Sequence, residues 1–216
     1  MDGERTLLCF GDSNTHGACP MAHVDDRRRY PWRVRWTGVL AAGLGQGWRV
    51  VEEGHNGRTT VHPDPIEGTN RNGLAYIPVS LESHQPIDVV LLMLGTNDLK
   101  ARYNLPPSDI AAGLNVVVRT ICASEAGPDG AAPGVIIMAP PPILETGCLA
   151  EMFDGGTRKS TRLADLYRDV AHRYGAGFID TGRHIVSSAV DGIHFDIDQH
   201  AELGKVMVET VEAFMR

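Results

Sequence analysis

Residues that could together activate a nucleophile stand near the two ends of the sequence. Ser13 lies in the run GDSN at residues 11–14, and His194 closes the run DGIH at residues 191–194. A serine hydroxyl needs a base to attack at neutral pH, and imidazole titrates in the right range. The base in turn needs an acceptor that fixes its tautomer, which Asp191 can provide from a glycine-containing turn. Ser13, His194 and Asp191 therefore predict a catalytic triad.

The GDSN run by itself leaves a second interpretation open. Aspartate, serine and asparagine are the favoured N-capping residues, so residues 12–14 could simply begin a helix. The run is not the Gly-x-Ser-x-Gly elbow, because residue 15 is threonine. It also lacks the Gly-Lys-Ser/Thr ending of a phosphate loop. A serine at the start of a helical turn would still suit acyl transfer, because unpaired backbone N–H groups there can face an oxyanion.

Two further segments could supply hydrogen-bond donors to such an oxyanion. Gly57 follows Asn56, where a backbone N–H could approach a ligand without obstruction, although Asn-Gly is equally a strong turn signal. Asn97, in the run GTND at residues 95–98, carries an NH₂ group that could donate a third hydrogen bond. The alternative for Asn97 or Asp98 is a helix cap or a loop closure.

These segments all follow short β-rich runs, which alternate with runs of helical spacing. Most of the β-rich runs are almost continuously apolar, which is typical of strands that are buried on both faces of a parallel sheet. The pattern predicts one α/β domain over residues 1–216, a three-layer α/β/α sandwich on a five-stranded parallel sheet of flavodoxin-like shape. Ligands bind such folds beyond the carboxyl ends of the strands. We expect strands at 7–10, 49–52, 89–94, 135–138 and 178–180, and an amphipathic helix at 201–215.

Composition restricts the partners that we expect. The formal net charge is −7, so general attraction to nucleic acid is not expected. The basic run at residues 27–29 is interpreted as a solvated loop or a subunit contact. No stretch reaches the roughly 18 apolar residues of a membrane span, and no leader pattern is seen, which favours a cytoplasmic location. The four cysteines are scattered, and neither a zinc site, a disulfide framework nor an organic cofactor is indicated.

Taken together, the blocks resemble the four signature blocks of the SGNH (GDSL-type) hydrolases. The resemblance rests on residues 11–13, Gly57, residues 95–98 and residues 191–194, in that order. It implies the SGNH fold, with Ser13 as nucleophile and Ser13, Gly57 and Asn97 forming the oxyanion hole.

The sequence is more closely similar to the small bacterial arylesterase/acyltransferase branch of that family. This similarity is carried by residues 34–40, 52–54, 57–60, 93–98, 153–156 and 191–195. It implies hydrolysis of short-chain acyl esters, transfer of acyl groups to alcohols or peroxide in some members, and a homo-oligomer. His16 departs from the tryptophan that this branch often has there. Loop positions predict substrate contacts at the following residues: Asn14, His16, Pro141, Phe153 and Ile193.

Other functions remain as alternatives. A carbohydrate O-deacetylase or a thioesterase would use the same triad on a different ester. A non-catalytic α/β binding domain would keep the motifs without activating the serine. A small-molecule ester is the expected partner in the leading interpretation, because nothing in the sequence is long and apolar enough to indicate lipid binding.

Overall fold

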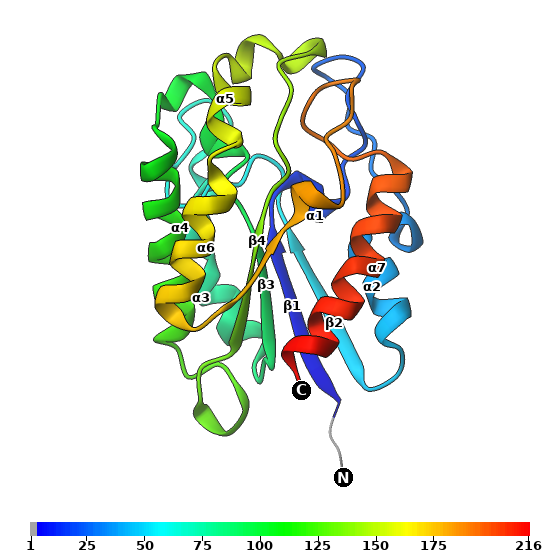
Figure 1. Ribbon diagram of the computed structural model, residues 1–216, viewed down its shortest axis with the longest axis vertical. Helices are drawn as coiled ribbons and strands as arrows, with labels where there is room; N and C mark the ends of the chain where they lie inside the picture. The colour runs from blue at the N-terminus through cyan, green and yellow to red at the C-terminus, as the bar shows by residue number, and fades with distance from the viewer. Residues whose placement is uncertain (1–3) are drawn as a thin grey trace.

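One parallel sheet organises the chain, and its strands occur in the order β2-β1-β3-β4-β5. The computed structural model describes residues 4–216 (Figure 1). The predicted five-stranded parallel sheet is confirmed. Strands β1, β2 and β4 extend one or two residues beyond both predicted ends, β5 begins one residue earlier, and β3 ends one residue earlier than predicted. The strands are β1 (Arg5–Gly11), β2 (Trp48–Gly54), β3 (Val89–Met93), β4 (Gly134–Ala139) and β5 (Gly177–Asp180).

Side chains of the central strands alternate between two apolar layers. In β1, Leu8 and Phe10 enter the core cluster on one face, whereas Leu7 and Cys9 enter the cluster on the other. All four side chains are fully buried. This period of two, with apolar residues on both faces, is what a strand covered by helices on both sides requires.

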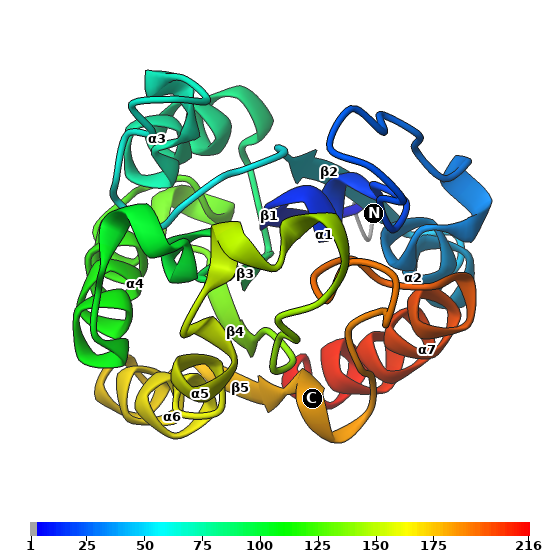
Figure 2. The same ribbon diagram turned by 90° about the horizontal axis from the view of Figure 1, so that it is seen from above.

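Helices cover both faces and complete the predicted three-layer arrangement (Figures 1 and 2). Helices α2 and α7 pack on each other along one face, and α3, α4 and α6 lie along the other. Short helices α1 and α5 lie toward the carboxyl edge of the sheet. The helices are α1 (Ser13–His16), α2 (Trp36–Leu44), α3 (Gly73–His84), α4 (Pro107–Cys122), α5 (Gly156–Ser160), α6 (Leu163–Tyr174) and α7 (Ile197–Phe214).

Two helices differ from expectation. Helix α7 begins at Ile197, four residues before the predicted start at residue 201, and ends at Phe214. Helix α3 was not predicted, because Pro78 interrupts its middle and a weak apolar pattern leaves only Ile77 and Leu81 as buried apolar side chains. Within residues 4–216, none of the helices is long and apolar enough to cross a membrane.

The register of the sheet brings three strand ends together. Gly11 at the end of β1 pairs with Gly54 of β2 and with Met93 of β3. Helix α1, which carries Ser13, therefore lies directly against the end of β2. A Cβ atom on Gly54 would lie 2.0 Å from the backbone nitrogen of His16, so only glycine permits this approach.

We expect Gly54→Ala to destabilise the fold by at least about 2 kcal/mol, because the added methyl meets backbone atoms that cannot rotate away. Urea unfolding measures the change. Gly43→Ala is the matched control, since its methyl would lie 2.4 Å from a methyl of the partly exposed Val208 side chain, which must shift, but would meet no backbone atom, and alanine favours the helix there. Equal unfolding free energies for the two variants would contradict this role of Gly54.

Candidate active site

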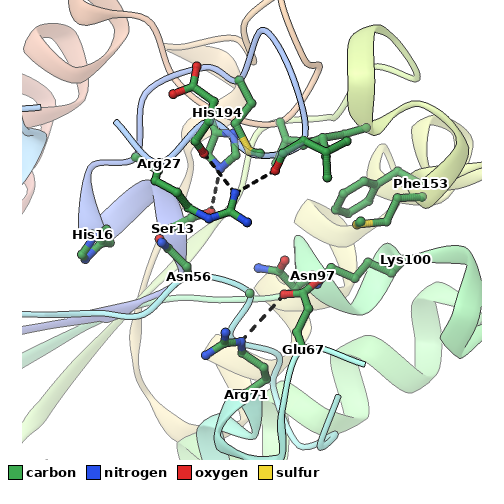
Figure 3. A pocket seen from close by; sticks show the side chains of 18 of the residues that line it. Ser13, His16, Arg27, Asn56, Glu67, Arg71, Asn97, Lys100, Phe153 and His194 are labelled. Carbon is green, nitrogen blue, oxygen red and sulfur yellow. Dashed lines mark hydrogen bonds and ion pairs between the residues drawn. The ribbon is translucent and has the colours of Figure 1, made fainter. Parts of the chain in front are cut away.

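Ser13, His194 and Asp191 form a continuous hydrogen-bonded chain. The Nε2 atom of His194 lies 3.1 Å from Oγ of Ser13, and its Nδ1 atom lies 2.6 Å from Oδ2 of Asp191. Figure 3 shows Ser13, at the start of α1, facing His194, which lies in the loop before α7. With Nδ1–H donating to Asp191, Nε2 is free to accept the serine proton. The structure thus brings the three predicted residues together with the geometry that a triad needs.

Asp191 is held in place by its own loop and by the segment after α1. Its carboxylate accepts backbone N–H groups of Met21 at 2.7 Å and of Ile193 and His194 at 3.0 Å each. Burial alone raises the pKa of Asp191, but the hydrogen bonds and the charge of His194 outweigh it and leave the pKa below the ordinary 3.8. Asp191 is therefore ionised and able to orient His194 at neutral pH.

Ser13, Gly57 and Asn97, which were predicted to form the oxyanion hole, line one cavity. Gly57 lines the cavity beside Ser13 with φ of 74°, a left-handed conformation that favours glycine. Within residues 4–216, the N–H groups of Ser13 and Gly57 donate to no protein acceptor. Nδ2 of Asn97 donates to the carbonyl oxygen of Arg58 at 3.1 Å and lies 3.5 Å from Oδ2 of Asp12. One amide hydrogen is therefore engaged, and the second is weakly held and available to a ligand.

Asp98 closes the loop that carries Gly57. Its buried carboxylate accepts the backbone N–H of Thr60 at 3.0 Å and the Thr60 hydroxyl at 2.5 Å. This confirms the loop-closing interpretation for Asp98 and leaves Asn97 to face the cavity. Adjacent residues after β3 thus fix the backbone after β2 by two separate contacts.

Asn14 was predicted to touch substrate, and the structure places it elsewhere. Its side chain is buried and lies outside the cavity lining, with Nδ2 donating to the carbonyl oxygen of Ile193 at 3.1 Å. Asn14 therefore ties the turn of the serine to the loop of the histidine. The structure does not place Asn14 at the cavity, because proximity in sequence to Ser13 does not show on which side of a helical turn a side chain lies.

Pro141 also lies outside the cavity lining. It is buried beneath the segment that follows β5, whose Thr181 hydroxyl donates to the carbonyl of Ala139 and whose Ser187 hydroxyl donates to that of Pro142. The chain leaving β4 is thus covered by protein, and the expected substrate wall is instead interior packing.

The other three predicted contact residues do line a cavity of about 510 Å³ that opens at Ser13. Ile193 adjoins the triad, His16 lies at one edge, and Phe153 belongs to the long segment at residues 143–156. That segment folds over the site and adds two more apolar side chains, Leu149 and Met152. Burial, and then the nearby charge of Arg29, lower the pKa of His16, which favours its neutral form.

Charged side chains of the cavity were missed by the sequence interpretation. Arg27 belongs to the basic run that was interpreted as a solvated loop or subunit contact, but it lines the cavity. Opposite it, Nζ of Lys100 lies 2.6 Å from Glu67 and 3.4 Å from the buried Asp64, which also pairs with Arg102 at 3.0 Å. Among these residues, only Lys100 could have been expected near the site from the sequence, because it comes two residues after Asp98. No group of His, Cys, Asp and Glu suited to a metal ion occurs within residues 4–216.

This fold and this triad define a serine ester hydrolase, and comparison with known proteins agrees. Residues 9–201 match the GDSL-like lipase/acylhydrolase family, to which the chain belongs. The carbohydrate acetylesterase Est24 from Sinorhizobium meliloti is 38% identical, with a TM-score of 0.93 over 97% of this chain and 99% of that one. The native aryl esterase of M. smegmatis is 39% identical, with a TM-score of 0.92 over the same shares. No curated protein sequence matches the chain.

A putative arylesterase from Agrobacterium tumefaciens is also similar, at 35% identity and a TM-score of 0.86 over 97% of this chain and 99% of that one. The predicted SGNH resemblance is therefore confirmed. The same findings support a serine ester hydrolase over the alternative of a non-catalytic binding domain.

Asp12 gives the site a measurable pH dependence. Burial raises the pKa of its carboxyl from 3.8 to about 6, against the N–H of Asn14 and the charges of His194 and Arg58, which lower it. Between these two values the folded protein holds a proton that the unfolded chain releases, so the free energy of unfolding falls as the pH rises through this window. We expect Asp12→Asn to remove that fall. Urea unfolding at pH 4.5 and pH 7 measures the change in the free energy of unfolding. The same decrease between the two pH values in the wild type and in Asp12→Asn would contradict the assignment.

Proposed function

We propose that the protein is a serine esterase that hydrolyses short-chain acyl esters through an acyl-enzyme on Ser13. The observation that supports this most directly is the hydrogen-bonded chain of Ser13, His194 and Asp191 beside the cavity. Gly57 lines the same cavity, and its N–H donates to no protein acceptor within residues 4–216. A small-molecule ester placed there would have its carbonyl carbon near Oγ of Ser13 and its oxygen near the donors.

In the first half of the reaction, Oγ of Ser13 attacks the ester carbonyl and His194 takes its proton on Nε2. Asp191 stabilises the resulting imidazolium through Nδ1. The N–H groups of Ser13 and Gly57 and the free amide hydrogen of Asn97 stabilise the tetrahedral oxyanion. The intermediate collapses as the bond to the alcohol oxygen breaks, and His194 returns the proton to the leaving alcohol.

In the second half, water attacks the acyl-enzyme while His194 again accepts a proton. Collapse of the second tetrahedral intermediate releases the acid and restores Ser13. An alcohol or hydrogen peroxide in place of water would give acyl transfer by the same steps. Met152 and Phe153 are apolar side chains that line the cavity and exclude part of the water from it. This lowers the competition from water and so favours transfer of the acyl group to another acceptor.

The walls of the cavity support a short acyl group. Apolar residues line only part of it, and Arg27, Lys100 and Arg102 interrupt the lining. A long acyl chain would strip water from these charges without replacing their hydrogen bonds, which is costly. This argues for the short-ester function over a long-chain thioesterase.

Carbohydrate O-deacetylation is a second candidate with its own support. The charged and polar side chains that interrupt the lining could hydrogen-bond a polyol on the alcohol side of an acetyl ester, while the acetyl group stays at Ser13. Est24, the 38% identical protein, is described as a carbohydrate acetylesterase. Release of acetate from acetylated sugars, at rates that match or exceed those on aryl acetates, would favour this function.

A chain-length series of p-nitrophenyl esters from C2 to C12 tests the proposed function. We expect activity to peak at C2–C4 and Ser13→Ala to lower turnover on the order of a millionfold, because the covalent step is lost. Ser83→Ala, an exposed serine on α3, is the matched control. Activity that survives Ser13→Ala would overturn the nucleophile assignment.

Asn97→Ala tests the oxyanion hole separately from the triad. Loss of one donor should raise the barrier by roughly 3 kcal/mol, seen as a fall of at least about a hundredfold in kcat. Asn115→Ala on α4 is the control, because within residues 4–216 the only side-chain hydrogen bond of Asn115 is the one that its oxygen accepts from Arg173. Turnover near wild type in Asn97→Ala would show that its amide does not reach the oxyanion.

A further inference from the structure

The cavity has a charge opposite to that of the whole protein. The chain carries a formal net charge of −7, yet five cationic side chains line the cavity against two carboxylates. The buried Asp64 and Asp191 add two more carboxylates. The buried Asp12 adds another, which the charge of the neighbouring buried Arg58 offsets, so one cation remains in excess. The cations are Arg27, Arg28, Arg71, Lys100 and Arg102, and the lining carboxylates are Asp26 and Glu67.

Most of these cations are already paired. Arg28 binds Asp26 at 2.6 Å, and Lys100 and Arg102 share Asp64 and Glu67. Arg71 lies 3.8 Å from Glu67 and contacts His55. Among residues 4–216, Arg27 forms no ion pair. The excess positive charge of the cavity is therefore concentrated at Arg27.

Arg27 is exposed, and its hydrogen bonds to nearby backbone carbonyls leave its charge unneutralised. One terminal nitrogen donates to the carbonyl oxygens of Val24 at 2.7 Å and of Asp26 at 3.2 Å. The Nε–H and the other terminal NH₂ have no acceptor within residues 4–216. A planar guanidinium with an open edge matches the two oxygens of a carboxylate. Figure 3 shows Arg27 on the side of the cavity that carries Ser13 and His194.

We propose that Arg27 selects esters whose alcohol part carries a carboxylate. This inference rests on the proposed esterase function and specifies its substrate class. A short acyl group stays next to Oγ of Ser13, to which it becomes bonded. Arg27 is exposed at the mouth of the cavity, so it faces the other half of the ester. The carboxylate docks on the open edge of the guanidinium while the carbonyl carbon lies at Ser13.

Two acetyl esters of matched size test this selection: 4-acetoxybenzoate, which is anionic, and 4-acetoxybenzamide, which is neutral. The measurement is kcat/KM for each ester in the wild type, in Arg27→Gln and in Arg27→Glu. The ratio between the two esters, compared across proteins, cancels their different leaving-group reactivity. We expect Arg27→Gln to lower the preference for the anionic ester about fivefold, and Arg27→Glu to lower it further.

Arg33→Gln is the matched control, because Arg33 is exposed, lies outside the cavity lining and gives the same change in net charge. It should leave the preference at the wild-type value. In the wild type, 0.5 M NaCl should weaken the preference by screening, and in Arg27→Gln it should have little further effect.

The two proposals fail in distinguishable ways. A preference that is the same in wild type, Arg27→Gln and Arg33→Gln, with the neutral ester still hydrolysed, would overturn the role of Arg27 and leave the esterase function standing. Failure of the wild type to hydrolyse either ester would overturn the esterase function and this inference together.

Discussion

The site depends on a junction between two segments that are far apart in the chain. Asn14, one residue after the serine, donates to the carbonyl of Ile193, one residue before the histidine. The backbone N–H of Met21 donates to Asp191 across the same junction. These hydrogen bonds are buried or partly buried, where breaking one leaves an unsatisfied polar group. They hold Ser13 and His194 at hydrogen-bond distance although 181 residues separate them.

A second constraint joins the loops after β2 and β3. Asn97 and Asp98 each contact the backbone at Arg58 or Thr60, so the loop that carries Gly57 cannot move without disturbing both. Arg58 is itself buried and donates to the carbonyl of Gly11, at the end of β1. Three strand ends are thus cross-linked by polar contacts. This arrangement pre-organises the N–H groups that face the cavity, and such donors stabilise an oxyanion because they need no reorganisation during the reaction.

The sequence predicted the elements that follow a simple spatial rule. Parallel strands place their carboxyl ends at one edge, so residues after β1, β2 and β3 were expected to meet there, and Ser13, Gly57 and Asn97 do. The rule does not specify on which side of a turn a residue lies. That is why Asn14 and Pro141 were assigned to substrate although one ties two loops and the other is packed beneath the segment after β5.

The charged residues that line the cavity could not be predicted from the sequence, for a related reason. Arg27 and Glu67 come from irregular segments whose paths no periodicity describes, and Lys100 from a short connection after β3. The net charge that these side chains give the cavity depends on which of them form ion pairs, and only the tertiary structure shows that. Lys100 is buried against carboxylates, whereas Arg27 is not paired at all within residues 4–216. Composition alone gave an acidic chain and could not reveal a locally cationic cavity.

The activation of Ser13 as a nucleophile can be tested directly. The protein is treated with a fluorophosphonate ester, digested, and the modified peptide identified by mass spectrometry. We expect one phosphonyl group per chain, located on Ser13, and strongly slowed labelling in His194→Ala. A protein that is not labelled, or that is labelled at another serine while Ser13 stays free, would contradict this expectation.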